Sequence, residues 1–228
     1  MRDRSIRASR GTAAAAALAL LGSAILMFAS PAAAQPPLIT DPPDDRIVVE
    51  VVTVNGSGCP AGTAAVAVAP DNTAFTVTYS AYMALVGVGA SATDFRKNCQ
   101  INVLVHVPQG FTFAIAKADY RGFASLARGS NALLKANYYF QGHSQTEFRQ
   151  HGLGSPYDDN WQASDETPVT ALVYRPCGDQ RLLNVNTELR VNKGSSDTKK
   201  TTSLIAMDST DGSFNTLYHF HWKTCPRH

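Results

Sequence analysis

Four carboxylates in the polar stretch between Gly142 and Thr167 are the side chains of this chain best suited to chemistry. Two carboxylates on opposite sides of a bound sugar can act as the acid and base of a glycoside hydrolase. Carboxylate oxygens gathered in a loop can also bind calcium. No EF-hand pattern accompanies them, so a solvated acidic loop is the competing interpretation. The four residues are Asp158, Asp159, Asp165 and Glu166.

Aromatic side chains in and near the same stretch are suited to stacking on a sugar ring. Tyr157 and Trp161 lie among polar residues, where an aromatic side chain is harder to explain as part of a core. Tyr139 alternates with Tyr138 and Phe140, and it should therefore face away from the core. We predict a surface that binds an extracellular ligand, such as a carbohydrate, and that contains Tyr139, Tyr157, Asp158, Asp159 and Trp161.

His219 and His221 lie two residues apart, so on a strand they would share a face and could bind one metal ion. Phe220 and Trp222 would then form the apolar face, which leaves the histidines on the wet side. No H-x-H-x-E run supplies a third ligand. The pair is a weak metal candidate, and we expect no cofactor unless the acidic loop binds calcium.

A serine nucleophile is also considered in the polar stretch. Residues 142–146 (GHSQT) resemble the nucleophile elbow G-x-S-x-G but lack its last glycine, and no helix is expected to follow. We therefore predict no catalytic residue. The first hypothesis is a non-catalytic protein that binds an extracellular ligand or acts at the cell surface. The alternative is a secreted hydrolase that acts on polysaccharide through carboxylates of residues 142–167.

Alternating apolar and polar residues predict the strands that position these side chains. The period of two is regular in residues 75–82, 99–107, 183–191 and 214–222. Turn residues separate the runs, and residues 208–212 should form a hairpin tip between the last two strands. The pattern predicts an all-β fold, an antiparallel sandwich or jelly roll of about ten short strands. Less regular strand candidates are Ile47–Val54, Ala64–Ala69, Phe111–Ala118, Leu133–Gln141, Val169–Tyr174 and Ser203–Met207.

The first 34 residues have the layout of a secretory signal peptide: four arginines, an apolar stretch over residues 12–29, and small residues before Gln35. We expect cleavage after Ala34, rather than an uncleaved anchor, because the alanine-rich stretch is barely long enough to span a bilayer. Residues 35–46 contain four prolines and should form an extended tether. The single β-sandwich domain should then cover residues 47–228 of a secreted protein without a membrane span.

The charge of the chain narrows the class of partner, and its cysteine content indicates how the chain is cross-linked. The mature chain keeps 16 basic and 17 acidic residues, which argues against a nucleic-acid partner. An even number of cysteines in an exported chain indicates disulfides, and three pairings of four cysteines are open. We favour Cys59–Cys99 and Cys177–Cys225, because each joins segments that are close in sequence. A zinc site has little support, because no C-x-x-C spacing is present.

Five short motifs, in order, carry a family resemblance. They are residues 58–63 (GCPAGT), 97–99 (KNC), 108–111 (PQGF), 119–122 (DYRG) and 222–225 (WKTC). Together they resemble a family of small secreted proteins catalogued as domain of unknown function 4360. The match extends over nearly the whole mature chain. The resemblance implies a secreted, disulfide-bonded β domain and brings no activity with it.

Overall fold

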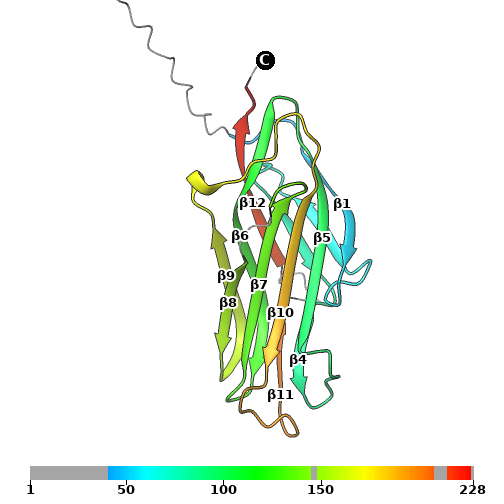
Figure 1. Cartoon of the computed structure of the whole chain (residues 1–228), viewed down its shortest axis with the longest axis vertical. Coiled ribbons are helices and arrows are strands. Elements are labelled where there is room, and N and C mark those ends of the chain that lie inside the picture. The colour runs from blue at the N-terminus through cyan, green and yellow to red at the C-terminus, as the bar shows by residue number, and fades with distance from the viewer. Residues whose placement is uncertain (1–40, 145–147, 208–214, 227–228) are drawn as a thin grey trace, which may run out of the picture. The chain divides into compact units, whose positions relative to one another are not determined.

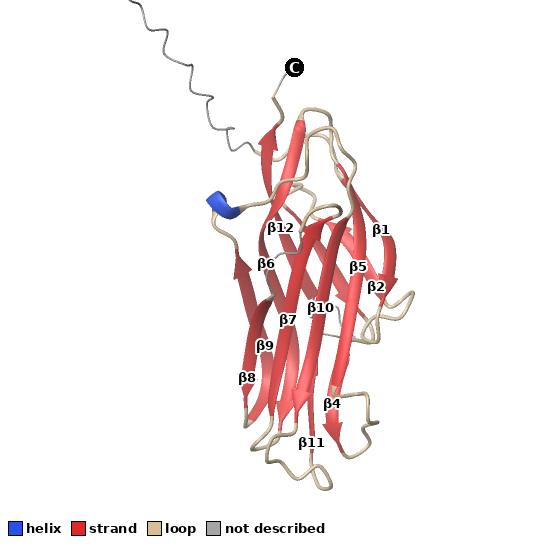
Figure 2. Cartoon of the chain, in the orientation of Figure 1, coloured by secondary structure: helices blue, strands red, loops and turns tan. Residues whose placement is uncertain are grey.

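Two antiparallel β-sheets make up the structure, a computed structural model that describes residues 41–144, 148–207 and 215–226 (Figures 1 and 2). The strand order of sheet 1 is β1 (Val48–Asn55), β5 (Arg96–His106), β10 (Leu183–Asn192), β7 (Asn131–Phe140) and β8 (Arg149–Gly154). The order of sheet 2 is β2 (Ala64–Val68), β3 (Ala74–Tyr79), β12 (Asn215–Thr224), β6 (Phe111–Leu126), β11 (Thr202–Ala206) and β4 (Met83–Gly87). The remaining strand of sheet 2, β9 (Tyr157–Glu166), pairs with β6.

The predicted all-β antiparallel fold is confirmed, with twelve strands in the described residues instead of about ten. The extra strands come mainly from the stretch expected to be a polar loop, which contains β8 and β9. The predicted strand Val169–Tyr174 is wrong. Val169–Ala171 forms a 3-10 turn, η1, directly after Pro168. Proline offers no amide donor to a sheet, which favours a turn at this position.

The long strand β6 organises sheet 2 because both of its edges are occupied. One edge pairs with β9 over residues 117–126 of β6. The other edge pairs first with β12, Thr216 opposite Tyr120, and then with β11, Ala206 opposite Phe123. The last two strands therefore follow one another along the same edge and do not form the predicted hairpin. Residues 208–212, expected at its tip, lie outside the described residues.

The core lies between the two sheets and is rich in aromatic side chains. Phe113 of β6 packs edge-on against Phe140 of β7, with ring centroids 5.3 Å apart. Tyr138 of β7 meets Tyr218 of β12 in the same way at 6.3 Å. Fully burying one such side chain contributes about 1.5–3 kcal/mol. These contacts join a strand of sheet 1 to a strand of sheet 2 and so define the sandwich.

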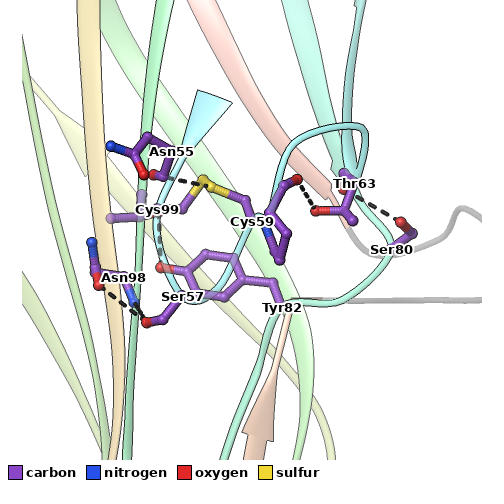
Figure 3. The surroundings of a disulfide bond; sticks show 10 residues. Asn55, Ser57, Cys59, Thr63, Ser80, Tyr82, Asn98 and Cys99 are labelled. Atoms are coloured by element: carbon purple, nitrogen blue, oxygen red, sulfur yellow. Dashed lines mark hydrogen bonds between the residues drawn. A yellow bond between two sulfur atoms is a disulfide. The ribbon is translucent and has the colours of Figure 1, made fainter. Parts of the chain in front are cut away.

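Both predicted disulfides are confirmed. Cys59–Cys99 closes a separation of 40 residues and Cys177–Cys225 one of 48, and no described cysteine is free. The first disulfide lies in the core beside Tyr82 (Figure 3). A Cβ atom on Gly58 would come within 2.2 Å of the Tyr82 ring. The glycine of the GCPAGT motif is therefore required by a close approach between a turn and a buried ring.

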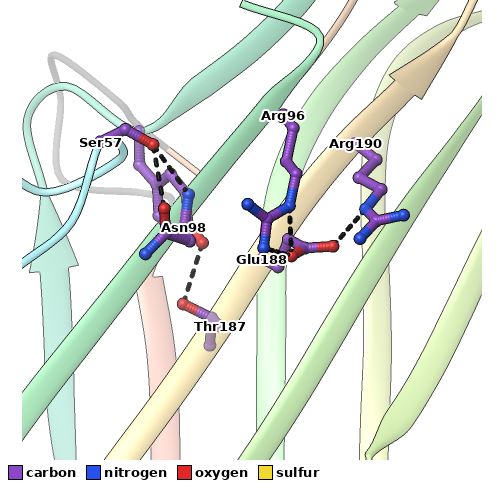
Figure 4. A network of polar contacts seen from close by, with 7 residues as sticks. Ser57, Arg96, Asn98, Thr187, Glu188 and Arg190 are labelled. Carbon is purple, nitrogen blue, oxygen red and sulfur yellow. Dashed lines mark hydrogen bonds and ion pairs between the residues drawn. The ribbon is translucent and has the colours of Figure 1, made fainter. Parts of the chain in front are cut away.

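An ion-pair cluster connects two neighbouring strands on the outer face of sheet 1 (Figure 4). Glu188 of β10 receives hydrogen bonds from Arg96 of β5 and from Arg190 of its own strand. Partial burial raises the pKa of Glu188, but the hydrogen bonds and charges of the two arginines outweigh this effect and lower it below its ordinary value. The carboxylate therefore stays ionised and contributes to the pairing of β5 with β10.

The end of the proline-rich segment is held against the domain. The Asn72 side-chain amide donates hydrogen bonds to the carbonyls of Pro43 (2.8 Å) and Asp45 (3.0 Å). Its Oδ1 atom accepts a hydrogen bond from the backbone amide of Ile47, which is buried. Asn72 itself adopts a positive φ of 56°, a conformation that asparagine tolerates better than most residues. Within the described ranges, no helix is long and apolar enough to cross a membrane.

Candidate functional site

The polar stretch between Gly142 and Thr167, interpreted from the sequence as an acidic loop, contains two edge strands. β8 pairs with β7 at the edge of sheet 1, and β9 pairs with β6 in sheet 2. The two strands are consecutive but belong to different sheets, so together they cross from one layer to the other. Figure 2 shows them next to each other along one side of the molecule. Each strand is stabilised by pairing with a longer neighbour, which compensates for its polar sequence.

A groove of about 810 Å³ lies along β8 and β9. The aromatic side chains of Tyr157 and Trp161 contribute to its wall. Three residues with amide side chains, Gln150, Asn160 and Gln162, also line it, and all three are exposed. Amide groups and aromatic faces are the surfaces with which proteins hold neutral polar ligands.

A buried carboxylate lies beneath this groove. Asp165 of β9 is 4% exposed, and its Oδ2 atom accepts a hydrogen bond of 3.0 Å from the hydroxyl of Tyr120 on β6. Its Oδ1 atom lies 2.8 Å from Nε2 of His151, which lines the groove from β8. Burial, followed by the charges of Tyr218 and Asp165, raises the pKa of Tyr120 well above its ordinary value. Tyr120 therefore remains a donor, and the three side chains form one network that reaches from β6 to the groove.

Trp161 is buried against the backbone of β6. It pairs in register with Gly122, and a Cβ atom on that glycine would lie 2.5 Å from the indole ring and 2.0 Å from the Ala206 carbonyl oxygen. The indole Nε1 atom is buried, and no hydrogen-bond partner for it exists in the described part of the chain. The DYRG motif now has a physical explanation: Tyr120 binds Asp165, and Gly122 makes room for Trp161.

The five predicted ligand-binding residues are not brought together at one place. Tyr157 and Trp161 line the groove. Asp158 and Asp159 are exposed on β9, and Asp159 accepts a hydrogen bond of 2.6 Å from the backbone amide of Asn160. Tyr139 lies on β7, where it lines a different and much smaller cavity of about 50 Å³. The groove thus combines two of the five residues, and the assignment of all five to a ligand stays a prediction.

The described carboxylates of the stretch do not form a facing pair. Neighbours in a strand point to opposite faces, so Asp158 is separated from Asp159, and Asp165 from Glu166. Asp159 and Asp165 share a face, but they are six residues apart, about 20 Å along a strand. A hydrolase pair would need its two carboxylates within about 10 Å. The strand geometry removes the premise of the hydrolase alternative for these residues.

The two candidate metal ligands on β12 have separate partners. Nε2 of His219 lies 2.8 Å from Oδ2 of Asp119, and Nδ1 of His221 lies 2.7 Å from the hydroxyl of Tyr174. Partial burial, with the charge of Lys223, lowers the pKa of His221. Among the residues that the structure describes, no group of three His, Cys, Asp or Glu side chains could hold a metal ion. Metal binding at these histidines and calcium binding therefore stay predictions.

Sequence reasoning missed Arg175 as a candidate functional residue. It is buried, with 6% of its surface exposed, at the end of the sandwich where β6 begins. The available signal was one arginine at the end of the apolar run 172–174, just before Pro176 and Cys177. Charged side chains are almost never fully buried without a partner, so such a residue calls for an explanation.

Comparison with known proteins decides the family. Residues 45–225 match the family described as domain of unknown function (DUF4360). The chain belongs to this family. An uncharacterized secreted protein of Arthroderma benhamiae (strain ATCC MYA-4681 / CBS 112371) is 33% identical to it over 181 residues, 79% of this chain and 73% of the relative. This relative and the two disulfides agree that the DUF4360 chain is a secreted protein.

Solved structures resemble the DUF4360 chain only distantly. TmCBM61 in complex with beta-1,4-galactotriose is 8% identical, with coverage of 78% of this chain and 88% of that one and a TM-score of 0.25. The cowpea mosaic virus top component is 11% identical, with coverages of 78% and 90% and a TM-score of 0.26. Scores this low carry no argument about a ligand.

Proposed function

We propose that this secreted β-sandwich is a non-catalytic binding protein, and that the groove along β8 and β9 binds an extracellular carbohydrate. Sugars present hydroxyl groups that both donate and accept hydrogen bonds. The exposed amides of Gln150, Asn160 and Gln162 can match both functions. Tyr157, at the same groove, offers an aromatic face.

The observation that carries the proposal is the network of Tyr120, Asp165 and His151. A buried carboxylate costs free energy unless it is paired, and apolar side chains in its place are often no less stabilising. The network fixes the ring of His151, whose side chain is 25% exposed. The Nδ1 atom of this ring has no hydrogen-bond partner within the described residues and is free for a ligand hydroxyl. A polar group held rigidly at a groove is what a binding site requires.

A binding role is favoured over hydrolysis by the scatter of the carboxylates. Asp165, the one buried carboxylate among the residues that the structure describes, is engaged by Tyr120 and His151. Asp158 and Asp159 extend into solvent from opposite faces of β9. The groove therefore offers hydrogen bonds and an aromatic surface in place of an acid and a base.

A glycan array with residues 35–228 tests the proposal, followed by calorimetric titration of each glycan that binds. We expect His151→Ala and Gln162→Ala each to weaken binding about tenfold, the loss of roughly one hydrogen bond. The matched control is Gln100→Ala, an exposed glutamine on β5 outside the groove. If no glycan binds, or if the control weakens binding as much as Gln162→Ala, the proposal is wrong.

A further inference from the structure

Another cavity, of about 600 Å³, lies at the end of the sandwich where β5 runs into β6 and β12 ends. Figure 1 shows this end of the two sheets at the top. Arg175 lines it, together with the disulfide partners Cys177 and Cys225. It shares no lining residue with the groove along β8 and β9. The feature is therefore independent of the site proposed for carbohydrate.

The guanidinium of Arg175 is short of partners for a buried cation. Its Nε–H group is buried and, among the described residues, meets no acceptor. One terminal nitrogen donates a long hydrogen bond of 3.5 Å to the Phe111 carbonyl. The Phe113 ring lies 5.9 Å away, a distance at which a cation–π contact offsets a small part of the desolvation cost.

Among the described residues, no carboxylate forms an ion pair with this guanidinium. Burial lowers the pKa of Arg175, and the charge of Asp179 opposes this only in part. Asp179 is itself paired with Arg181, 2.9 Å from that guanidinium. An arginine side chain remains protonated under all ordinary conditions. The cavity therefore has a positively charged wall with no counter-ion from the described part of the chain.

The backbone holds Arg175 firmly in this position. Its amide donates a hydrogen bond of 3.0 Å to the carbonyl of Phe113, and its carbonyl accepts one of 2.5 Å from the hydroxyl of Thr112. Two residues further on, Cys177 is cross-linked to Cys225. The buried cation is thus fixed by three separate constraints, as expected of a built site.

We propose that Arg175 is the anion-binding group of a second ligand site, which takes the carboxylate of an organic ligand. The planar guanidinium fork matches a carboxylate, and a charge-assisted pair of this kind is stronger than a neutral hydrogen bond. The cavity has room for the rest of such a ligand. Gln109 and Gln180 offer amides to it, and Val107 and Phe111 offer apolar surface.

Calorimetric titration of residues 35–228 with galacturonate, with neutral galactose and with inorganic phosphate tests this site. Galacturonate should bind at least tenfold more tightly than galactose, since only the acid carries the carboxylate. Arg175→Met should abolish this preference. Arg121→Met is the matched control, because it removes an exposed arginine of β6 and changes the net charge equally. It should leave the preference intact.

A second variant keeps the test valid if Arg175→Met does not fold. Gln180→Trp changes an exposed residue at the cavity and should weaken galacturonate binding about tenfold while the circular-dichroism spectrum stays unchanged. Equal affinity for galacturonate and galactose would overturn the proposal. So would an equal loss of the preference in Arg121→Met. Phosphate binding without galacturonate binding would overturn the choice of a carboxylate.

Discussion

Nε2 of His151 lies 2.8 Å from Oδ1 of Asp165, although the two residues belong to strands of different sheets. His151 is on the edge strand β8, and Asp165 is the last buried residue of β9. This contact is therefore a polar link between the two layers beside the groove. Tyr120 extends it into β6, so the link connects three strands.

Removal of the buried carboxylate should destabilise the protein. Asp165→Ala leaves the hydroxyl of Tyr120 without an acceptor, and we expect the free energy of unfolding to fall by about 2–3 kcal/mol. Tyr120→Phe should cost about 1–2 kcal/mol, and the double variant less than the sum of the two. Urea denaturation measures all three. Asp158→Ala, on the exposed face of β9, is the control and should change stability by less than about 0.5 kcal/mol.

Gly122→Ala should destabilise the protein because a methyl group has no room between Trp161 and the Ala206 carbonyl. We expect a loss of about 2–3 kcal/mol in the free energy of unfolding, with a change in Trp161 fluorescence. Gly152→Ala is the matched control, since its Cβ atom would meet nothing within 4 Å. Equal stability of the two variants would contradict the packing of Trp161 against Gly122.

Four buried tyrosines should make the fold sensitive to alkali. Burial raises the pKa of Tyr79 to about 12 and that of Tyr82, Tyr120 and Tyr218 well above the ordinary value. The folded state keeps these protons while the unfolded state releases them above about pH 10, so stability is full below pH 10 and is lost as the pH rises. Tyrosinate absorbance should show these groups ionising together with unfolding, as followed by circular dichroism. Their ionisation in a folded protein near pH 10 would contradict the burial.

Acid should weaken the cluster around Glu188. Its folded pKa is lowered, so the stabilisation is present above the unfolded value of about 4.5 and is lost as the pH falls through the folded value. Glu188→Gln should reduce the free energy of unfolding at pH 7 by about 1 kcal/mol and have a smaller effect at pH 3. Urea denaturation at the two pH values measures the difference. An equal effect at both would show that the carboxylate charge contributes nothing.

The sequence predicted the strands whose two faces differ clearly. In β12, buried Tyr218, Phe220 and Trp222 alternate with half-buried His219 and His221. Such an alternation indicates a strand with one buried face. The two disulfides were predicted correctly because, at both of them, the cysteines that are closest in sequence also lie next to each other in space.

The sequence did not reveal β8 and β9, for a physical reason. Their inward positions include half-buried His151 and buried Asp165, two polar side chains that contact each other. Gly152 and Gly154 occupy two of the three outward positions of β8, so Gln150 is the one polar residue on that face. A strand that is held by a neighbour's edge and by a contact between two polar inward side chains has no regular apolar period to detect. The groove could not be predicted for the same reason.

The two disulfides should differ in their resistance to reduction, because they differ in exposure. Cys59 is fully buried and Cys99 is 2% exposed, whereas Cys177 is exposed and Cys225 is half-buried. Exchange requires a thiolate to reach a sulfur atom, so a dilute reductant should open Cys177–Cys225 first under native conditions. Trapping with an alkylating agent and peptide mass spectrometry should find the label on these two cysteines.

Reduction of the core disulfide Cys59–Cys99 should need global unfolding, so its rate should rise with added urea in parallel with the unfolding rate. The Cys59→Ala/Cys99→Ala variant should lose about 4 kcal/mol on the chain-entropy model. The Cys177–Cys225 disulfide closes a loop of similar length, so the Cys177→Ala/Cys225→Ala variant should lose a similar amount of unfolding free energy. The two pairs of variants therefore separate the accessibility of a disulfide from its contribution to stability. Equal rates of reduction for the two disulfides in the native protein would show that Cys59 and Cys99 are not shielded by the core.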